Sequence, residues 1–237
     1  MRTDGRKYDE LRKIEIIPDY NRYAEGSVLV KFGETHVLCT ASIEPQVPKW
    51  LQGSGKGWIS AEYGMIPRST HSRMNREKAA TSGRTQEISR LIGRSLRAAV
   101  DLQKLGEKQI YVDCDVLQAD GGTRTAAITG GYVALALALN FLTQQGEFKS
   151  SPLIRQISAI SVGYHKDQAL LDLNYDEDSN IETDMNFVMT DSGDFIEIQG
   201  TAEAAPFSPQ NLNEMILLAT AGCQQLHKIQ QQIIEKG

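Results

Sequence analysis

The chain has 237 residues, of which 41% are hydrophobic and 23% are charged, as is typical of a soluble globular protein with its own core. A formal net charge of −5 argues against a protein that wraps nucleic acid over its whole surface. Cys39, Cys114 and Cys223 lie far apart and form neither a metal motif nor a disulfide framework, which favours a reducing compartment. The sequence is charged from Arg2 onward without an apolar signal segment, so we expect a cytoplasmic protein.

Charge is distributed unevenly along the sequence. Basic side chains dominate residues 68–97, where they are Arg68, Arg73, Arg76, Lys78, Arg84, Arg90, Arg94 and Arg97. The balance reverses in residues 172–184, where the charged side chains are Asp172, Asp176, Glu177, Asp178, Glu182 and Asp184. A local basic site and a separate acidic site are therefore compatible with the negative total.

The amino-terminal part of the chain predicts strands before it predicts a helix. Period-2 alternation indicates strands at residues 27–32, 35–42 and 58–63, and Gly33-Glu34 turns the first two into a hairpin. Residues 67–83 have almost no apolar side chains and predict a long polar loop of the kind that is usually functional or disordered. Apolar residues then recur every three or four positions, which predicts a helix over residues 85–105 closed by Gly106.

Three arginines form a stripe on a second face of this helix. Arg90, Arg94 and Arg97 are four and three residues apart, so their side chains project from neighbouring turns. Two interpretations are open: a solvated or subunit-contact face, or a face that contacts RNA.

The carboxyl-terminal half repeats the alternation of strands and helices. Strands are predicted at residues 109–118, 154–162, 168–173, 184–189 and 195–199, the last four as two antiparallel pairs. Helices are predicted at residues 126–142 and from Ser208-Pro209 to about 236, where the serine is the N-cap and the proline the first helical residue. Because no flexible linker or repeat divides the chain, we expect residues 1–237 to form one domain of the α+β class with a mixed sheet.

A glycine turn, residues 120–125, joins the strand at 109–118 to the following helix. Its sequence Asp-Gly-Gly-Thr-Arg-Thr combines two glycines, two hydroxyls and a permanent charge. Amides at a helix start carry the positive end of the helix dipole, and Arg124 offers a planar fork of donors suited to phosphate. The turn is interpreted either as an anion-binding site or as an ordinary strand-to-helix connection with a solvated arginine.

The acidic run does not match a calcium loop. Counted from Asp172, Glu177 stands where an EF-hand needs glycine, and Thr183 stands where it needs glutamate. What is left is a set of hard oxygen ligands, which would suit magnesium together with substrate phosphates or would form a solvated acidic turn. The four histidines, His36, His71, His165 and His227, are scattered and are interpreted as structural or surface residues.

An anion-binding turn, a polar loop with arginines and hard-cation ligands are together the parts needed for phosphoryl or nucleotidyl transfer on RNA. Several longer motifs then resemble the ribonuclease PH family over nearly the whole chain. These are MRTDGR at residues 1–6, AEGS at 24–27, AEYGM at 61–65, SGRTQE at 82–87, LIGRSLR at 91–97, residues 113–125, DMN at 184–186 and QGTAE at 199–203.

The resemblance implies a ribosomal protein S5 domain 2-like fold and a homohexameric ring built as a trimer of dimers. It also implies a phosphorolytic 3′→5′ exoribonuclease that trims tRNA precursors after the CCA and can add nucleotides in reverse. The residues that match the family's motifs are Arg84, Gly122, Thr123 and Arg124 for binding inorganic phosphate, Asp178 and Asp184 for Mg²⁺ and catalysis, and Arg68, Arg73 and Arg76 for contacting tRNA.

Two other functions are alternatives to this one. The first is a non-catalytic RNA-binding subunit of an exosome-like ring, which should lack either the phosphate-binding or the acidic half of the site. The second is a metal-dependent hydrolytic nuclease, which would release nucleoside monophosphates without needing phosphate.

Overall fold

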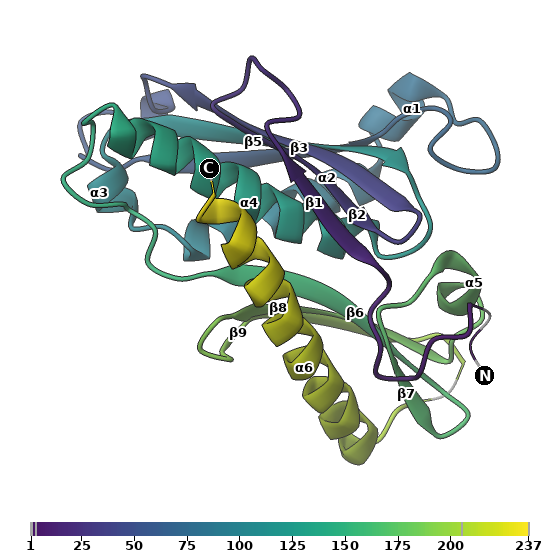
Figure 1. Cartoon of the computed structure of the whole chain (residues 1–237). Helices are drawn as coiled ribbons and strands as arrows, with labels where there is room; N and C mark the ends of the chain where they lie inside the picture. Colours follow the sequence, from purple (N-terminus) through teal and green to yellow (C-terminus); the bar gives the residue numbers. More distant parts are fainter. Residues whose placement is uncertain (1, 3, 205, 237) are drawn as a thin grey trace.

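A computed structural model describes residues 2, 4–204 and 206–236, and it contains two sheets (Figure 1). The first sheet has the order β1-β2-β3-β5-β4 and consists of β1 (Ile14–Pro18), β2 (Gly26–Phe32), β3 (Thr35–Glu44), β4 (Trp58–Met65) and β5 (Gln109–Gln118). The second sheet has the order β7-β6-β8-β9 and consists of β6 (Ile157–His165), β7 (Gln168–Leu171), β8 (Thr183–Thr190) and β9 (Phe195–Ala202). Neighbouring strands are antiparallel except β4 and β5, which are parallel, so the predicted mixed sheet is confirmed.

Three long helices and several short ones accompany the sheets. They are η1 (Lys49–Leu51), α1 (Arg76–Ala80), α2 (Gly83–Ala98), α3 (Leu102–Leu105), α4 (Thr123–Gln144), α5 (Tyr175–Asp178) and α6 (Pro209–Ile234). Ser208 caps α6 by accepting a hydrogen bond from the amide of Asn211, and a proline occupies the start of the helix, as predicted.

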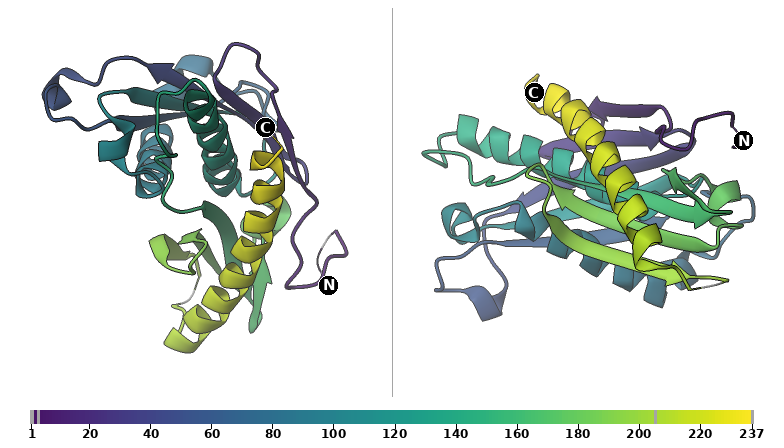
Figure 2. Two further views of the ribbon diagram at one scale, coloured as in Figure 1. Left: turned by 60° about the vertical axis from the view of Figure 1, so that its left-hand side comes forward. Right: turned by 90° about the horizontal axis from the view of Figure 1, so that it is seen from below.

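Helix α4 lies between the two sheets (Figure 2), where it packs on β2 and β3 of the first sheet and on β6 of the second. It is long and apolar enough to span a membrane, but 89% of its apolar window is buried inside the protein. Gly130 allows this close packing, because a Cβ there would lie 2.5 Å from a methyl carbon of Val30. Helix α6 packs along β6 and β7. One cluster of buried apolar side chains includes residues from both sheets and from α2, α4 and α6.

The predicted helix over residues 85–105 is wrong in its length. It ends at Ala98, and Val100 then forms an isolated bridge with Leu153 before α3 begins. Asp101 interrupts the helix because its side chain accepts hydrogen bonds from the amides of Gln103 and Lys104 and so caps a new helix. The predicted polar loop at 67–83 also contains a helix, α1, which the absence of apolar periodicity concealed.

Candidate active site

A cavity of about 380 Å³ lies where β5 gives way to α4, beside α5 and the loop before α1. It is lined by all six residues that the sequence predicted for phosphate binding and catalysis: Arg84, Gly122, Thr123, Arg124, Asp178 and Asp184. A second hollow of about 870 Å³ shares Arg84, Arg124, Asp178 and Asp184 with the cavity and extends along β9. Residues from the helices α2, α4 and α5 and from the strands β4, β6 and β8 therefore meet in one place.

The glycine turn delivers the start of α4 to this cavity. Gly122 is the N-cap in the left-handed conformation, with φ of 62°, and its lack of a side chain leaves the first helical turn without a side-chain cap. The helix begins at Thr123, three residues earlier than predicted, so the predicted anion-binding residues themselves form its first turn. First-turn amides and the helix dipole favour an anion here.

Gly121 has a packing role that its sequence motif does not predict. A Cβ on Gly121 would lie 2.6 Å from the carbonyl carbon of Asn174 and 2.7 Å from the carbonyl oxygen of Leu173. The turn thus packs directly against the backbone segment that leads into α5, where Asp178 lies. Glycine at 121 is required by this contact between the two halves of the site, and by a φ of 75°.

Thr123 is fixed by a buried tyrosine. The Tyr63 hydroxyl and the Thr123 hydroxyl are 2.8 Å apart, in a hydrogen bond in which either oxygen can donate. Burial raises the pKa of Tyr63, so the phenol stays protonated at neutral pH. Tyr63 comes from β4 and holds the threonine side chain beside the cavity.

The two predicted phosphate-binding arginines reach the cavity from different helices. Arg124 donates a hydrogen bond of 3.0 Å to the side-chain oxygen of Gln199, and its guanidinium lies 3.6 Å from the carboxylate of Glu87. Arg84 lies in the first turn of α2, which Ser82 caps, and its side chain is exposed along both hollows. Two guanidinium groups at one cavity supply the charge that a multiply charged phosphate needs.

The acidic pair faces these arginines. Desolvation, with the nearby Asp178 carboxylate as the next cause, raises the pKa of Asp184 to about 6. Partial desolvation also raises the pKa of Asp178, although Arg84 and Arg124 oppose the shift. Asp184 Oδ1 is buried and has no hydrogen-bond partner among the described residues, while Oδ2 lies 3.5 Å from the side-chain nitrogen Nδ2 of Asn186.

These features fit a divalent cation. A positive ion would relieve both the orphaned carboxylate oxygen of Asp184 and the repulsion by which Asp178 raises the pKa of Asp184. Within the described part of the chain, no group of three or more His, Cys, Asp or Glu residues forms a closed metal cage. An open site with one or two carboxylates suits Mg²⁺, which keeps waters and binds substrate phosphates as its other ligands.

The rest of the acidic run is not a cation site. Asp172 is fully buried and pairs with Arg12 at 2.7 Å, and Glu177 pairs with Arg2 at 2.6 Å. Of this run only Asp178 and Asp184 line the cavity among the described residues. These ion pairs could not be predicted from the sequence, because Arg2 and Arg12 lie more than 150 positions away from their partners along the chain.

The basic loop has a divided placement. Arg68, Arg73 and Arg76 are exposed, and among the described lining residues of the cavity none of the three appears. The loop instead presents Thr70, His71, Ser72 and Met74 to the cavity. The three arginines are thus within two positions, along the chain, of residues that line the cavity.

The arginine stripe on α2 is largely occupied by contacts within the chain. Arg94 pairs with Glu197 at 2.8 Å. Arg97 stacks over the ring of Trp58 at 4.4 Å and donates a hydrogen bond to the carbonyl oxygen of Ile59. Arg90 lines a separate hollow with Glu62, away from the catalytic cavity. The stripe therefore contributes to packing between α2, β4 and β9.

An aromatic pair at the cavity was missed from the sequence. The His71 and Tyr175 rings lie with centroids 6.3 Å apart, and both residues line the cavity. Tyr175 is exposed although it is large and apolar. It was hidden in the acidic run, and His71 in the polar loop, so only the fold places them together.

Comparisons with known proteins agree with this geometry. The sequence matches domain 1 of the 3′ exoribonuclease family over residues 10–139 and domain 2 over residues 155–222. It is 65% identical to a ribonuclease PH of Bdellovibrio bacteriovorus over 226 residues, which are 95% of this chain and 93% of the relative.

Solved structures share the fold. Rrp46 of rice (Oryza sativa) superposes with a TM-score of 0.80 at 20% identity, covering 98% of this chain and 100% of that one. A chain of the Archaeoglobus fulgidus exosome with RNA bound to the active site superposes with a TM-score of 0.80 at 22% identity, covering 96% of this chain and 91% of that one. A chain of an archaeal exosome core superposes with a TM-score of 0.77 at 25% identity, covering 97% of this chain and 91% of that one. With both family domains matched in order and a relative at 65% identity, the chain belongs to the ribonuclease PH group of the 3′ exoribonuclease family.

Proposed function

We propose that the cavity between the glycine turn and α5 binds inorganic phosphate and the 3′ end of RNA side by side. The chain is a phosphorolytic 3′→5′ exoribonuclease that processes tRNA, a phosphate-dependent tRNA nucleotidyltransferase. The observation that carries the proposed site is the meeting of two arginines, a helix start and two carboxylates in one cavity.

The phosphate seat consists of the first-turn amides of α4, the Thr123 hydroxyl and the guanidinium groups of Arg84 and Arg124. Amides at a helix start bind phosphate without further help, and the two arginines add charge-assisted bonds. Tyr63 and Gln199, which contact Thr123 and Arg124, keep these donors in place.

In the reaction, an oxygen of the bound phosphate attacks the phosphorus of the last phosphodiester. The bond between that phosphorus and the 3′-oxygen of the preceding nucleotide breaks, and the 3′-oxygen takes a proton. The products are a nucleoside 5′-diphosphate and an RNA that is one nucleotide shorter. Arg84 and Arg124 stabilise charge on the reacting phosphates through preorganised donors.

Asp178 and Asp184 would hold Mg²⁺ directly or through waters. When bound, the cation neutralises negative charge on the reacting phosphates and lowers the pKa of a coordinated water. The proton that the leaving 3′-oxygen takes would come from one of these carboxyl groups or from a coordinated water.

The terminal nucleotide of the RNA has an aromatic seat in the same cavity. Bases stack on exposed aromatic rings without sequence preference, and Tyr175 offers such a ring beside His71. Arg68, Arg73 and Arg76 on the adjacent loop would bind the RNA backbone, which gives affinity that depends on salt and little on sequence.

The proposal extends to assembly and location. A homohexamer is the expected assembly, and the multichain exosome neighbours support a ring in general terms. A cytoplasmic location is also proposed, because Cys39, Cys114 and Cys223 are all free and buried. The alternative of a non-catalytic ring subunit is disfavoured, because such a subunit should lack one half of the site and this cavity has both.

The test incubates a 3′-tailed tRNA precursor with the enzyme and Mg²⁺, with and without inorganic phosphate, and identifies the released nucleotides. Nucleoside diphosphates that appear only with phosphate support the proposal. Nucleoside monophosphates released without phosphate would establish hydrolysis, and no release in either condition would establish a binding subunit. Asp184→Asn should bind RNA with unchanged affinity but release no nucleotide.

A further inference from the structure

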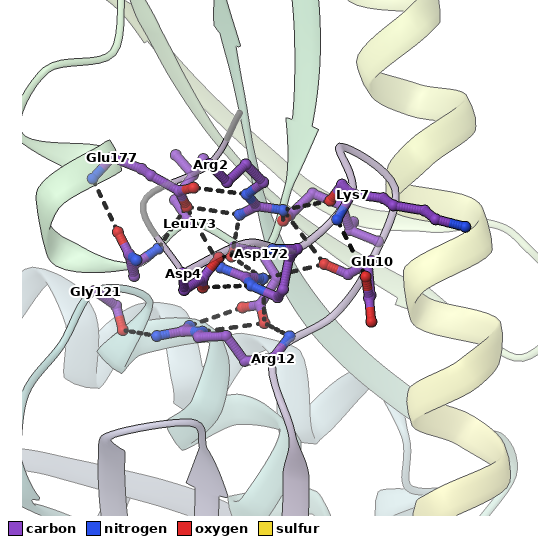
Figure 3. A network of polar contacts seen from close by, with 12 residues as sticks. Arg2, Asp4, Lys7, Glu10, Arg12, Gly121, Asp172, Leu173 and Glu177 are labelled. Atoms are coloured by element: carbon purple, nitrogen blue, oxygen red, sulfur yellow. Dashed lines mark hydrogen bonds and ion pairs between the residues drawn. The ribbon is translucent and has the colours of Figure 1, made fainter.

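We propose that three arginines of the amino-terminal segment, the buried Arg2 and Arg12 and the half-buried Arg6, are positioning residues that fix the phosphate seat relative to the acidic pair. None of them lines the catalytic cavity among the described residues. Together with Asp172 and Glu177 they form the buried polar network between the two halves of the site (Figure 3). This inference rests on the proposed phosphate seat.

Arg12 and Asp172 form the centre of the network. Nε and Nη2 of Arg12 donate to both carboxylate oxygens of Asp172, at 3.1 and 2.7 Å, and the Arg12 amide donates to the same carboxylate at 2.8 Å. Arg12 is 6% exposed and Asp172 is 0% exposed, so each charge depends on the other. A buried ionic pair with additional hydrogen bonds has a narrow geometry, because neither group has water to replace its partner.

The remaining side-chain nitrogen of Arg12, Nη1, forms hydrogen bonds with the glycine turn. Nη1 donates to the carbonyl oxygens of Asp120, at 2.5 Å, and Gly121, at 3.4 Å. Thr35 supports the same two residues, since its hydroxyl donates to the carbonyl of Gly121 and accepts from the amide of Asp120. Holding these carbonyls fixes the peptide planes that precede α4, and thus the direction of its first-turn amides.

The other two arginines extend the network to the acidic half. Arg2 donates to both carboxylate oxygens of Glu177 at 2.6 Å and to the main-chain oxygen of Asp172 at 3.0 Å. Arg6 donates to the same main-chain oxygen at 3.0 Å. Glu177 directly precedes Asp178 in α5, so anchoring Glu177 anchors the helix that presents a catalytic carboxylate.

Asp172 therefore links both halves: its side chain holds the arginine that grips the phosphate seat, and its main chain is held by the arginines that anchor α5. Its φ of 55° is unusual for a residue other than glycine, and the network stabilises this conformation. Asp120 closes the loop on the far side, because its carboxylate accepts a bond from the Tyr175 amide at 3.2 Å. We therefore expect substitutions of Arg12 and of Arg2 to affect different kinetic constants.

The first variant is Arg12→Lys, which keeps the charge opposite Asp172 but loses the fork that reaches the turn. We expect KM for inorganic phosphate to rise by about 10-fold to 100-fold, because an error of about 1 Å in a binding group is enough for such a loss. KM for RNA should change by less than about 2-fold.

The second variant is Arg2→Lys, which loses the two hydrogen bonds that Arg2 donates to the Glu177 carboxylate. We expect kcat to fall in this variant, with little change in KM for phosphate.

Leu105→Ala is the matched control. Leu105 is fully buried in α3, at the opposite end of the molecule from α5 (Figure 1), so its truncation lowers stability without touching the network. All variants are assayed below their unfolding temperatures, and Leu105→Ala should leave both KM values unchanged. If Arg12→Lys does not fold, Asp172→Asn, which keeps the shape and removes the charge, replaces it with the same expectation.

The outcomes separate the inference from the function it rests on. A rise in phosphate KM for Arg12→Lys but not for Leu105→Ala supports positioning. An unchanged phosphate KM in a folded, less stable Arg12→Lys protein would show that the network serves stability alone, and would overturn the inference. A wild-type enzyme that releases nucleotides without phosphate would overturn the proposed phosphate seat itself.

Discussion

Asp184 is a carboxyl group kept where its charge is disfavoured. Its pKa is about 6 in the folded protein against 3.8 for an unperturbed aspartate. A carboxyl with a raised pKa binds a proton more tightly when the protein is folded, so its protonated form favours folding. As pH rises from about 4 through about 6, Asp184 loses its proton and with it this stabilising contribution. At neutral pH the ionised residue therefore lowers the free energy of unfolding.

We therefore predict that Asp184→Asn stabilises the protein while abolishing turnover. In EDTA at pH 7.5 the free energy of unfolding should rise by about 1–3 kcal/mol, from the size of the pKa shift. At pH 4 the difference should disappear. Urea unfolding at the two pH values measures it, with Asp167→Asn on an exposed turn as control. An equal gain at both pH values would contradict the electrostatic explanation.

Arg124→Ala tests the phosphate seat at the same scale. Removing this guanidinium should lower kcat/KM for phosphate by on the order of 10²-fold or more, because the lost donor acts on charge in the transition state. Phosphate titration at saturating RNA measures the change, and Arg155→Ala, an exposed arginine before β6, is the control. A variant that keeps a normal phosphate requirement would remove Arg124 from the site.

Residue types predicted the chemistry better than they predicted partners. The six residues proposed for phosphate and metal binding do line one cavity. They could be predicted because they belong to long motifs that occur in a fixed order along the chain. Arg12, Asp172 and Tyr175 were missed, since each acts through a contact that exists only after distant segments have folded together. A charged residue in a sequence does not tell whether it will be buried in an ion pair.

At the scale of elements, the contact between the glycine turn and the segment before α5 makes a steric prediction. Gly121→Ala places a Cβ 2.6 Å from the backbone of Asn174 at a positive φ, so the two halves of the site must separate. We expect a large loss of thermal stability together with loss of phosphate binding. Differential scanning fluorimetry with added phosphate measures both.

Gly83→Ala is the matched control for that experiment. Gly83 begins α2 beside Arg84, and nothing lies within 4 Å of a Cβ built there. Alanine should be neutral or slightly stabilising, because it restricts the unfolded chain without a clash. Equal losses for the two variants would show that the steric contact at Gly121 is not the cause.

The basic loop carries a prediction about salt. Arg73→Ala should weaken RNA binding to the same extent for different sequences and should lower the slope of log affinity against log salt by about 1, as expected for one lost phosphate contact. Fluorescence anisotropy across a salt series measures the slope, with Lys149→Ala as the control in an exposed segment. An unchanged slope would place Arg73 outside the RNA path.

Elements with a clear period were predicted well. The strand at residues 109–118 was predicted with the bounds of β5, and the hairpins of β2 with β3 and β6 with β7 are confirmed. Two short helices, α1 and α5, were missed, and α3 was merged into the helix predicted over residues 85–105. Each of the three has five residues or fewer, too few to establish a period of 3.6. They form through caps at Asn75, Asp101 and Asn174, which in a sequence look like turn residues.

At the scale of the whole molecule, the chain is predicted to act as a hexamer. Several large apolar side chains are exposed on the single chain, including Trp50, Phe141, Ile198 and Leu217. Light scattering at micromolar concentration should give the mass of six chains, and the mass of one 26.2 kDa chain would contradict the ring.

The central claim is that a phosphate ion held by the glycine turn attacks the RNA directly. The reaction should be run with phosphate labelled with oxygen-18 at every position, and the released nucleotides analysed by mass spectrometry. Direct attack predicts that the β-phosphate and the bridging oxygen of each nucleoside diphosphate carry the full label. The Arg124→Ala variant should form the labelled nucleoside diphosphate more slowly. Unlabelled nucleoside monophosphates, formed at the same rate with or without phosphate, would contradict the account.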